Sequence, residues 1–67
     1  MAVARVTEII AGSDKGFDDA VNVGIERASK TLKNVTGAWV KGQKVEVKDG
    51  KIVEYRVQMD VTFILKD

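Results

Sequence analysis

Three side chains in the second half of the sequence have the chemistry to hold a flat aromatic ligand. Trp39 is the only tryptophan and offers a large π-face on which a ring can stack. Gln58 can donate and accept hydrogen bonds at the polar edge of such a ring, and Arg56 can pair with a phosphate or a negatively charged ring. The competing interpretation is that Trp39 packs in a subunit interface, where tryptophan is enriched, and both roles are compatible near a symmetry axis.

Carboxylates provide a second candidate site. Glu46, Glu54 and Asp60 are expected on the polar face of the predicted strands. An oligomer that repeats them around an axis could bind a hard cation such as Ca²⁺ or Mg²⁺. The simpler interpretation is that they are solvated carboxylates, so from one chain we assign no metal ligand.

The composition gives little support to catalysis. The chain has no histidine and no cysteine, which removes the usual near-neutral general base, the usual zinc ligands and any disulfide. No serine stands beside a plausible base. The segment 12–16, Gly-Ser-Asp-Lys-Gly, superficially resembles a phosphate-binding turn but lacks the spacing of a P-loop. We interpret it as a turn with a helix cap, and we predict neither an enzyme nor a catalytic residue.

Size and charge limit the expected partners. A chain of 67 residues has room for one domain, 1–67, with one small core, so its stability must come from packing or from partner subunits. Eleven basic against ten acidic residues leave a net charge of +1, which argues against nucleic acid as a partner. No apolar run approaches a membrane span and the N-terminus lacks a secretory signal, so we expect a soluble, cytoplasmic protein.

The first half of the sequence predicts a strand followed by a helix. The segment 3–11, rich in Val and Ile, is typical of a strand that Gly12 ends. Ser13 is typical of a helix N-cap, with Asp14 in the first turn. Apolar residues then recur at steps of three and four, which predicts an amphipathic helix with a buried stripe of Phe17, Ala20, Val21, Gly24, Ile25, Ala28 and Leu32.

The second half predicts a β-hairpin. Val45 and Val47 alternate with charged residues, and the segment 48–50, Lys-Asp-Gly, is a turn signal. After the turn, polar and apolar residues alternate strictly from Ile52 to Leu65. This predicts a long strand with one buried side, formed by Val53, Tyr55, Val57, Met59, Val61, Phe63 and Leu65.

The same alternation predicts the pairing of the hairpin. A two-residue loop, 49–50, would set Val45 opposite Glu54 and mix buried with exposed side chains. We therefore expect a three-residue loop, 48–50, with Gly50 in a G1 bulge, which sets Val45 opposite Val53.

A second bulge is expected at Gly42, because the apolar parity changes along the strand that precedes the turn. Such a bulge would set Val40 opposite Val57 on the core side. It would also turn Trp39 to the outer face, opposite Gln58.

These elements predict an α+β fold of β-α-β-β order, a three-stranded antiparallel sheet packed on one amphipathic helix. The helix covers the odd-numbered face of the last strand. The opposite face carries Trp39, Arg56, Gln58 and Asp60 and is left open by this chain, which predicts that a ligand or a second subunit covers it.

The order of elements, the length and several landmarks resemble the dodecins, small proteins that assemble as hollow dodecamers and in many members bind flavins. The landmarks are the segment 6–12 with Ser13 opening the helix, the helix core from Ala20 to Ala28, and the strand 55–63, Tyr-Arg-Val-Gln-Met-Asp-Val-Thr-Phe. The resemblance covers nearly the whole chain. It implies the dodecin fold, a homododecamer and a flavin ligand.

Flavin-binding dodecins stack the isoalloxazine ring on a tryptophan of the second strand and hydrogen-bond it with a glutamine just after the tyrosine of the third. In this sequence the two positions fall on Gly37 and Arg56, while Trp39 and Gln58 each come two residues later. Because the strands run antiparallel, equal shifts along both do not move the pair as a block, and the family's binding geometry does not transfer directly. Some members lack the tryptophan and are linked to other ligands, including metal ions.

The leading hypothesis is a dodecin-like homododecamer that binds and sequesters a flavin (FMN, FAD or riboflavin) through Trp39, Arg56 and Gln58. The alternative is a dodecin-like assembly without flavin that binds metal ions such as calcium or forms a structural compartment. A small interaction module that acts as a dimer is a third interpretation. The sequence leaves open which flavin is bound and what the assembly does for the cell.

Overall fold

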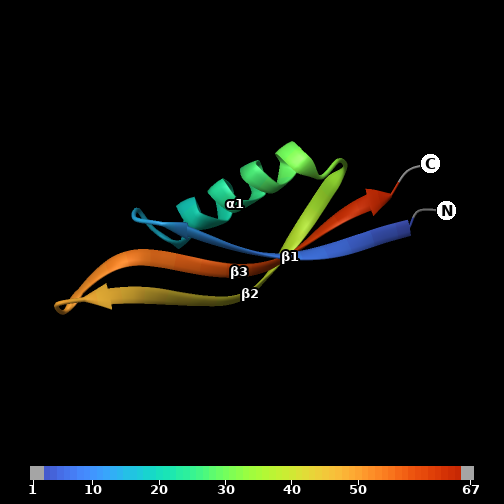
Figure 1. Cartoon of the computed structure of the whole chain (residues 1–67). Helices are drawn as coiled ribbons and strands as arrows, with labels where there is room; N and C mark the ends of the chain where they lie inside the picture. The colour runs from blue at the N-terminus through green and yellow to red at the C-terminus, as the bar shows by residue number, and fades with distance from the viewer. Residues whose placement is uncertain (1–2, 66–67) are drawn as a thin grey trace.

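The computed structural model describes residues 3–65, which form strands β1 (Val3–Ser13), β2 (Val35–Lys48) and β3 (Lys51–Leu65) and the helix α1 (Phe17–Thr31) (Figure 1). The order β-α-β-β is the one that the sequence predicts. The expected domain of residues 1–67 includes terminal residues that lie outside the described range.

β3 lies in the centre of the sheet. The strand order is β1-β3-β2, and both outer strands run antiparallel to β3. The prediction of an α+β fold with a three-stranded antiparallel sheet and one helix is confirmed. Its physical cause is the long alternating pattern of β3, which gives one apolar face for α1 and one polar face that points away from it.

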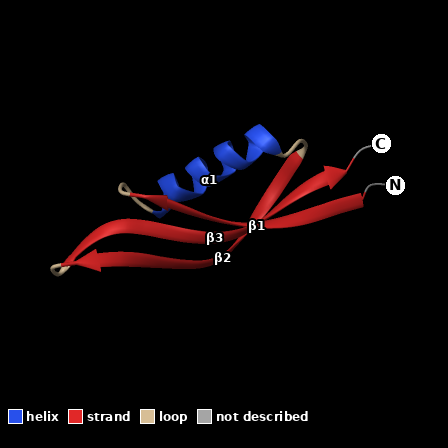
Figure 2. Ribbon diagram, in the orientation of Figure 1, coloured by secondary structure: helices blue, strands red, loops and turns tan. Residues whose placement is uncertain are grey.

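The core lies between α1 and the odd-numbered face of β3, and Figure 2 shows the helix over one side of the sheet. Val57, Met59 and Val61 have almost no exposed surface. α1 comes close because the residues that it turns to them are small. A Cβ added to Gly24 would lie 2.7 Å from the terminal methyl carbon of Met59, so the missing side chain sets the distance between helix and sheet.

The helix begins later than the sequence predicts. Ser13 is not the N-cap but the last residue of β1, and Gly16 immediately precedes α1. The Ser13 hydroxyl accepts a hydrogen bond from the backbone N–H of Lys15 over 2.9 Å and donates one to Asp19 Oδ2 over 2.6 Å. The prediction failed because a serine that bonds the backbone two residues on stabilises a turn as readily as a cap.

The hairpin loop has two residues, not the predicted three. Asp49 and Gly50 have φ of 52° and 76°, as a type I′ turn requires, and Lys48 pairs with Lys51. The parity conflict is resolved inside β3, where Val53 is an extra residue between the partners of Val47 and Glu46. Val45 consequently lies opposite Tyr55 rather than Val53.

The predicted bulge near Gly42 is present, with Lys41 as the extra residue of β2. The partners across β3 differ from the prediction, however. Val40 lies opposite Met59 rather than Val57, and Trp39 lies opposite Asp60 rather than Gln58. Trp39 nevertheless faces away from α1, as expected, because the predicted and observed partners differ by two residues and side chains alternate with period two.

The subunit is elongated, with principal dimensions of 51 × 19 × 14 Å. Its radius of gyration is 13.7 Å, against about 11 Å for a compact domain of this length. The end of the β2–β3 hairpin extends beyond α1 (Figure 1). Its apolar residues Val47, Ile52 and Val53 are about half exposed.

Candidate functional site

The face of the sheet that points away from α1, called here the outer face, carries the candidate residues. Cross-strand partners form rows on this face, and successive rows are about 7 Å apart because they are two residues apart along β1 and β3. Each row is named after its most informative residue. Read from β1 through β3 to β2, the Thr62 row is Val6-Thr62-Gly37, the Trp39 row is Glu8-Asp60-Trp39, the Gln58 row is Ile10-Gln58-Gly42 and the Arg56 row is Gly12-Arg56-Lys44.

A depression of about 190 Å³, the outer hollow, spans the Gln58 and Arg56 rows. Gly42 opens it on the β2 side because a glycine adds no side chain there. Ile10, which is 67% exposed, supplies an apolar wall on the β1 side. The lining consists of Ile10, Gly42, Gln43, Lys44, Arg56, Val57 and Gln58.

The amide of Gln58 is held in a defined orientation. Its Nε2 group donates a hydrogen bond to Glu8 Oε2 over 2.8 Å. Its Oε1 atom points towards Gly42, since it lies 4.0 Å from where a Cβ of that residue would be. Gln58 therefore offers a hydrogen-bond acceptor to a ligand in the outer hollow.

The guanidinium of Arg56 is paired with two carboxylates of β2 and β3. Its Nε group donates to Glu54, and its Nη1 atom lies 3.7 Å from Glu46 Oε1. The hydrogen bond and the charge of Glu54, with a smaller contribution from Glu46, raise the pKa of Arg56. Lys44 Nζ lies 3.9 Å from the same Glu46 oxygen. The positive charges at this end of the hollow are thus balanced by acids of the same chain.

Gly12 makes room for this arrangement. A Cβ at position 12 would lie 2.8 Å from Glu54 Oε2, too close for the carboxylate to stay where it is. A glycine in β1 therefore allows Glu54 to lie beside Arg56.

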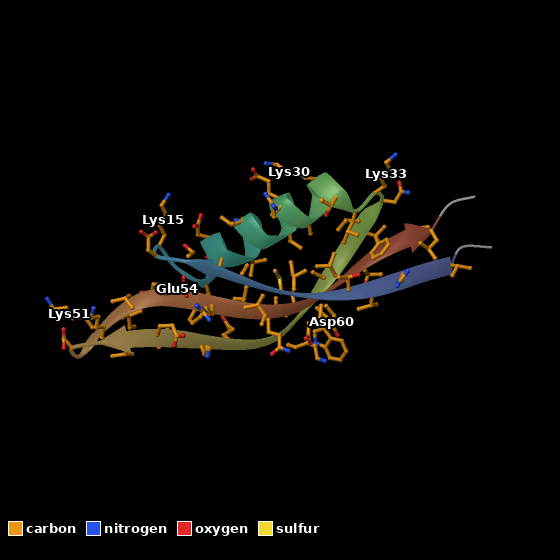
Figure 3. All side chains as sticks on the ribbon, in the orientation of Figure 1. Lys15, Lys30, Lys33, Lys51, Glu54 and Asp60 are labelled. Carbon is orange, nitrogen blue, oxygen red and sulfur yellow. The ribbon has the colours of Figure 1, made fainter. Side chains whose placement is uncertain are left out.

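Trp39 lies outside the lining of the outer hollow. Its side chain is 71% exposed, and it is a diagonal neighbour of Gln58 because it lies opposite Asp60. Figure 3 shows Asp60 on the side of the sheet away from α1, and Lys41 Nζ forms a salt bridge with its carboxylate over 3.5 Å. Of the three predicted residues, Arg56 and Gln58 line one hollow, and Trp39 stands one row beyond it.

The β-α-β-β unit that carries the outer face is shared with a known protein family. The family model described as Dodecin matches residues 3–66. The chain belongs to the dodecin family. The resemblance seen in the sequence is therefore confirmed over nearly the whole chain.

Solved dodecin structures superpose closely on this dodecin. The dodecin from Streptomyces davaonensis is 38% identical, with a TM-score of 0.95 over 98% of this chain and 97% of that one. A variant of the Thermus thermophilus dodecin is 27% identical, with a TM-score of 0.94 over 100% of both chains. The calcium dodecin from Mycobacterium tuberculosis, described as a calcium-chelating antigen with a novel calcium-binding site, is 29% identical, with a TM-score of 0.83 over 96% of this chain and 91% of that one. No curated protein sequence matches the chain significantly.

Flavin binding is typical of the family, and one relative is named for calcium. Glu46 lies directly opposite Glu54, but Arg56 contacts both carboxylates. Across residues 3–65, no group of three or more acidic side chains is close enough to hold a metal ion. Asp60 lies in the Trp39 row, apart from the other two acids.

Several residues of the outer hollow escaped prediction from the sequence. Ile10 follows Ile9, so the apolar pattern of β1 does not reveal which of the two faces outward. Gly42 was predicted as a bulge position, not as the open side of a hollow. Lys44, and Gly12 beside the hollow, could have been found only with the correct register, because each lies opposite Arg56. Among the described residues, no helix is long and apolar enough to span a membrane.

Proposed function

We propose that this dodecin binds a flavin on the outer face of its sheet and stores or sequesters it as a homododecamer. Family membership supports the proposal, because flavin binding is typical of dodecins. The observation that carries it is the outer hollow, where the Gln58 carbonyl group and the apolar Ile10 side chain meet beside Gly42. The exposed Trp39 ring lies on the same face, one row away.

The expected roles follow from chemistry. Trp39 stacks on the flavin ring, as aromatic pairs do at ring distances of roughly 4.5–7 Å. Gln58 Oε1 accepts a hydrogen bond from the imide N–H, which is the only N–H donor of the oxidised flavin ring. Ile10 covers the apolar part of the ring. Arg56 and Lys44 lie next to the path of the ring's side chain. Each role is one of binding, so the proposal contains no chemical step.

The surface that one subunit leaves uncovered supports the proposed assembly. A sheet covered on one side only, an elongated shape and half-exposed apolar residues leave each subunit incomplete. In an oligomer, a second outer face can cover a ring that stacks on the first. The family is oligomeric, which supports this arrangement.

Fluorescence titration tests the function. Riboflavin, FMN and FAD are titrated with protein while flavin emission is followed, because stacking on an indole ring quenches it. We expect saturable quenching at micromolar protein, and weaker quenching with Trp39→Ala. Glu26→Gln on the exposed side of α1 serves as the control and should bind as the parent protein does. The absence of quenching with all three flavins would refute the proposal.

A second candidate function is the binding of a hard cation. It is favoured by the position of Glu46 directly opposite Glu54 across the two strands and by the calcium dodecin among the relatives. For this, Arg56 would have to leave the two carboxylates, since it already neutralises part of their charge. Thermal unfolding with and without millimolar Ca²⁺ distinguishes the candidates. A clear rise of the midpoint that is lost in Glu54→Gln would support the cation, and an unchanged midpoint would exclude it.

A further inference from the structure

We propose that the Glu54 carboxylate sets the ligand preference of the outer hollow, so that the site favours uncharged riboflavin over the phosphate-bearing FMN and FAD. The inference rests on the proposed flavin-binding function. It concerns a choice that Trp39 and Gln58 do not make, because the ring they would hold is the same in all three flavins.

The order of the rows indicates that the Arg56 row distinguishes riboflavin from the phosphate-bearing flavins. A ring that stacks against Trp39 and bonds to Gln58 occupies two neighbouring rows, which together measure about 7 Å along the strands. The next row beyond Gln58 contains Arg56 and Lys44. A side chain that leaves the ring in this direction carries its terminal group, hydroxyl in riboflavin and phosphate in FMN, to these cations.

In the opposite direction, Lys41 beside the Trp39 row already forms a salt bridge with Asp60. Beyond the Trp39 row lies the Thr62 row, in which the three residues Val6, Thr62 and Gly37 carry no charge. The charges of the Arg56 row therefore decide whether a phosphate is attracted.

Each cation of the Arg56 row already has an acidic partner. Arg56 donates a hydrogen bond to Glu54, and both Arg56 and Lys44 lie within 4 Å of the same oxygen of Glu46, at 3.7 and 3.9 Å. Two positive and two negative groups leave no net charge to attract a phosphate. A phosphate that bonds to the remaining N–H groups of Arg56 would also lie close to the Glu54 carboxylate and be repelled by it, whereas a hydroxyl can join the existing hydrogen bonds.

Glu54 is the better specified of the two acids. Its oxygen is hydrogen-bonded to Arg56 Nε, and Gly12 of β1 leaves free the space that the carboxylate occupies. Any other residue at position 12 would press a Cβ against it. The bond to Arg56 and the free space at Gly12 together allow the negative charge to lie beside the guanidinium, which makes Glu54 a positioning residue for Arg56 and a specificity residue for the ligand.

The test compares the affinities of riboflavin and FMN on the assembled protein. The parent protein should bind riboflavin at least as tightly as FMN. Glu54→Gln keeps the size of the side chain and removes its charge, which leaves Glu46 as the remaining acidic partner of Arg56. It should raise the affinity for FMN relative to riboflavin about fivefold, as one unit charge at close range in a solvated site does. The gain should disappear at high salt.

Glu26→Gln is the matched control. It makes the same change of charge on the exposed side of α1, across the sheet from the outer hollow, and should leave the ratio of the two affinities unchanged. Gly12→Ala is a second variant, in which the new Cβ pushes Glu54 away without altering any charged residue. It should shift the ratio towards FMN as well, although less than Glu54→Gln.

The outcomes separate this inference from the function on which it rests. A parent protein that quenches no flavin refutes the proposed function. A parent protein that binds FMN several-fold more tightly than riboflavin refutes the specificity role alone. The same conclusion follows if correctly assembled Glu54→Gln and Gly12→Ala proteins both keep the parent ratio.

Discussion

Gln58 and Glu8 are hydrogen-bonded across the boundary between β3 and β1, with Gln58 Nε2 as the donor to Glu8 Oε2 over 2.8 Å. They belong to neighbouring rows, so the bond runs diagonally over the outer face. It occupies one N–H of the amide and turns the carbonyl towards the open position at Gly42. The acceptor that the proposed ligand requires is thereby oriented before the ligand binds.

The first prediction follows from this bond. Glu8→Ala leaves the Gln58 amide free to rotate and should weaken riboflavin binding about threefold, whereas Gln58→Leu removes the acceptor and should weaken it about tenfold. Dissociation constants from fluorescence titration measure both effects. Equal binding by Gln58→Leu and the parent protein would remove Gln58 from the site. Glu26→Ala, an acid-to-alanine change on exposed helix surface, controls for the loss of charge.

The second prediction concerns Trp39. Its side chain is 71% exposed in the subunit, so Trp39→Ala should change the stability of the subunit by no more than about 0.5 kcal/mol. Loss of stacking should weaken riboflavin binding about fivefold, while Trp39→Phe should keep most of the affinity because it retains an aromatic face.

A different pattern of results for Trp39→Ala would assign Trp39 to a subunit interface. If Trp39→Ala left the affinity for riboflavin unchanged and lowered the mass of the assembly, the interface interpretation would replace the stacking one. Native mass spectrometry of the same samples provides that measurement.

The sequence predicted the faces of the sheet better than the partners across it. Observed partners of Val45 and Val40 lie two residues along β3 from the predicted ones. A shift of two keeps every side chain on its face, because side chains alternate with period two. Trp39 therefore points outward as predicted, while its partner is Asp60 instead of Gln58.

The error arose at the hairpin turn. The alternation of polar and apolar residues argues against a two-residue loop, which would set buried opposite exposed residues, yet Asp49 and Gly50 do form it. An extra residue, Val53, repairs the pattern within β3, and its valine side chain gives no sign of a bulge, unlike the glycine at position 42. The contacts of the candidate site could not be predicted from the sequence for the same reason. The space that Gly12 leaves for Glu54, for example, depends on the register.

The third prediction concerns the packing of α1 against the sheet at Gly24. Alanine at position 24 would place a Cβ 2.7 Å from Met59 Cε and 2.9 Å from Ala11 Cβ. The methionine can move, but the Ala11 Cβ is fixed to the backbone of β1. Gly24→Ala should therefore destabilise the fold by about 1 kcal/mol, although alanine favours a helix over glycine by about the same amount.

Urea unfolding at a fixed protein concentration measures this change, since assembly makes stability depend on concentration. Asn22→Ala, on the exposed surface of the same helix, gains alanine's propensity without a contact and should be neutral or slightly stabilising. A Gly24→Ala protein more stable than the parent would show that helix and sheet separate easily.

The fourth prediction tests what the hairpin tip does in the assembly. Val47, Ile52 and Val53 are 60%, 50% and 49% exposed there, beyond the reach of α1. A lysine in place of Ile52 costs the isolated subunit little, because the side chain already meets water. In an oligomer that buries the tip, the same lysine is an unpaired buried charge.

Ile52→Lys should therefore keep the secondary structure seen by circular dichroism but lower the native mass, which the parent protein should show as a large multiple of the 7.3 kDa chain. Lys51→Gln, at the neighbouring exposed first position of β3, is the matched control and should assemble normally. If Ile52→Lys retained the full mass, the tip would lie outside the subunit contacts. The apolar surface that drives assembly would then have to be sought along β1 and α1, where Ile10 and Val23 are also exposed.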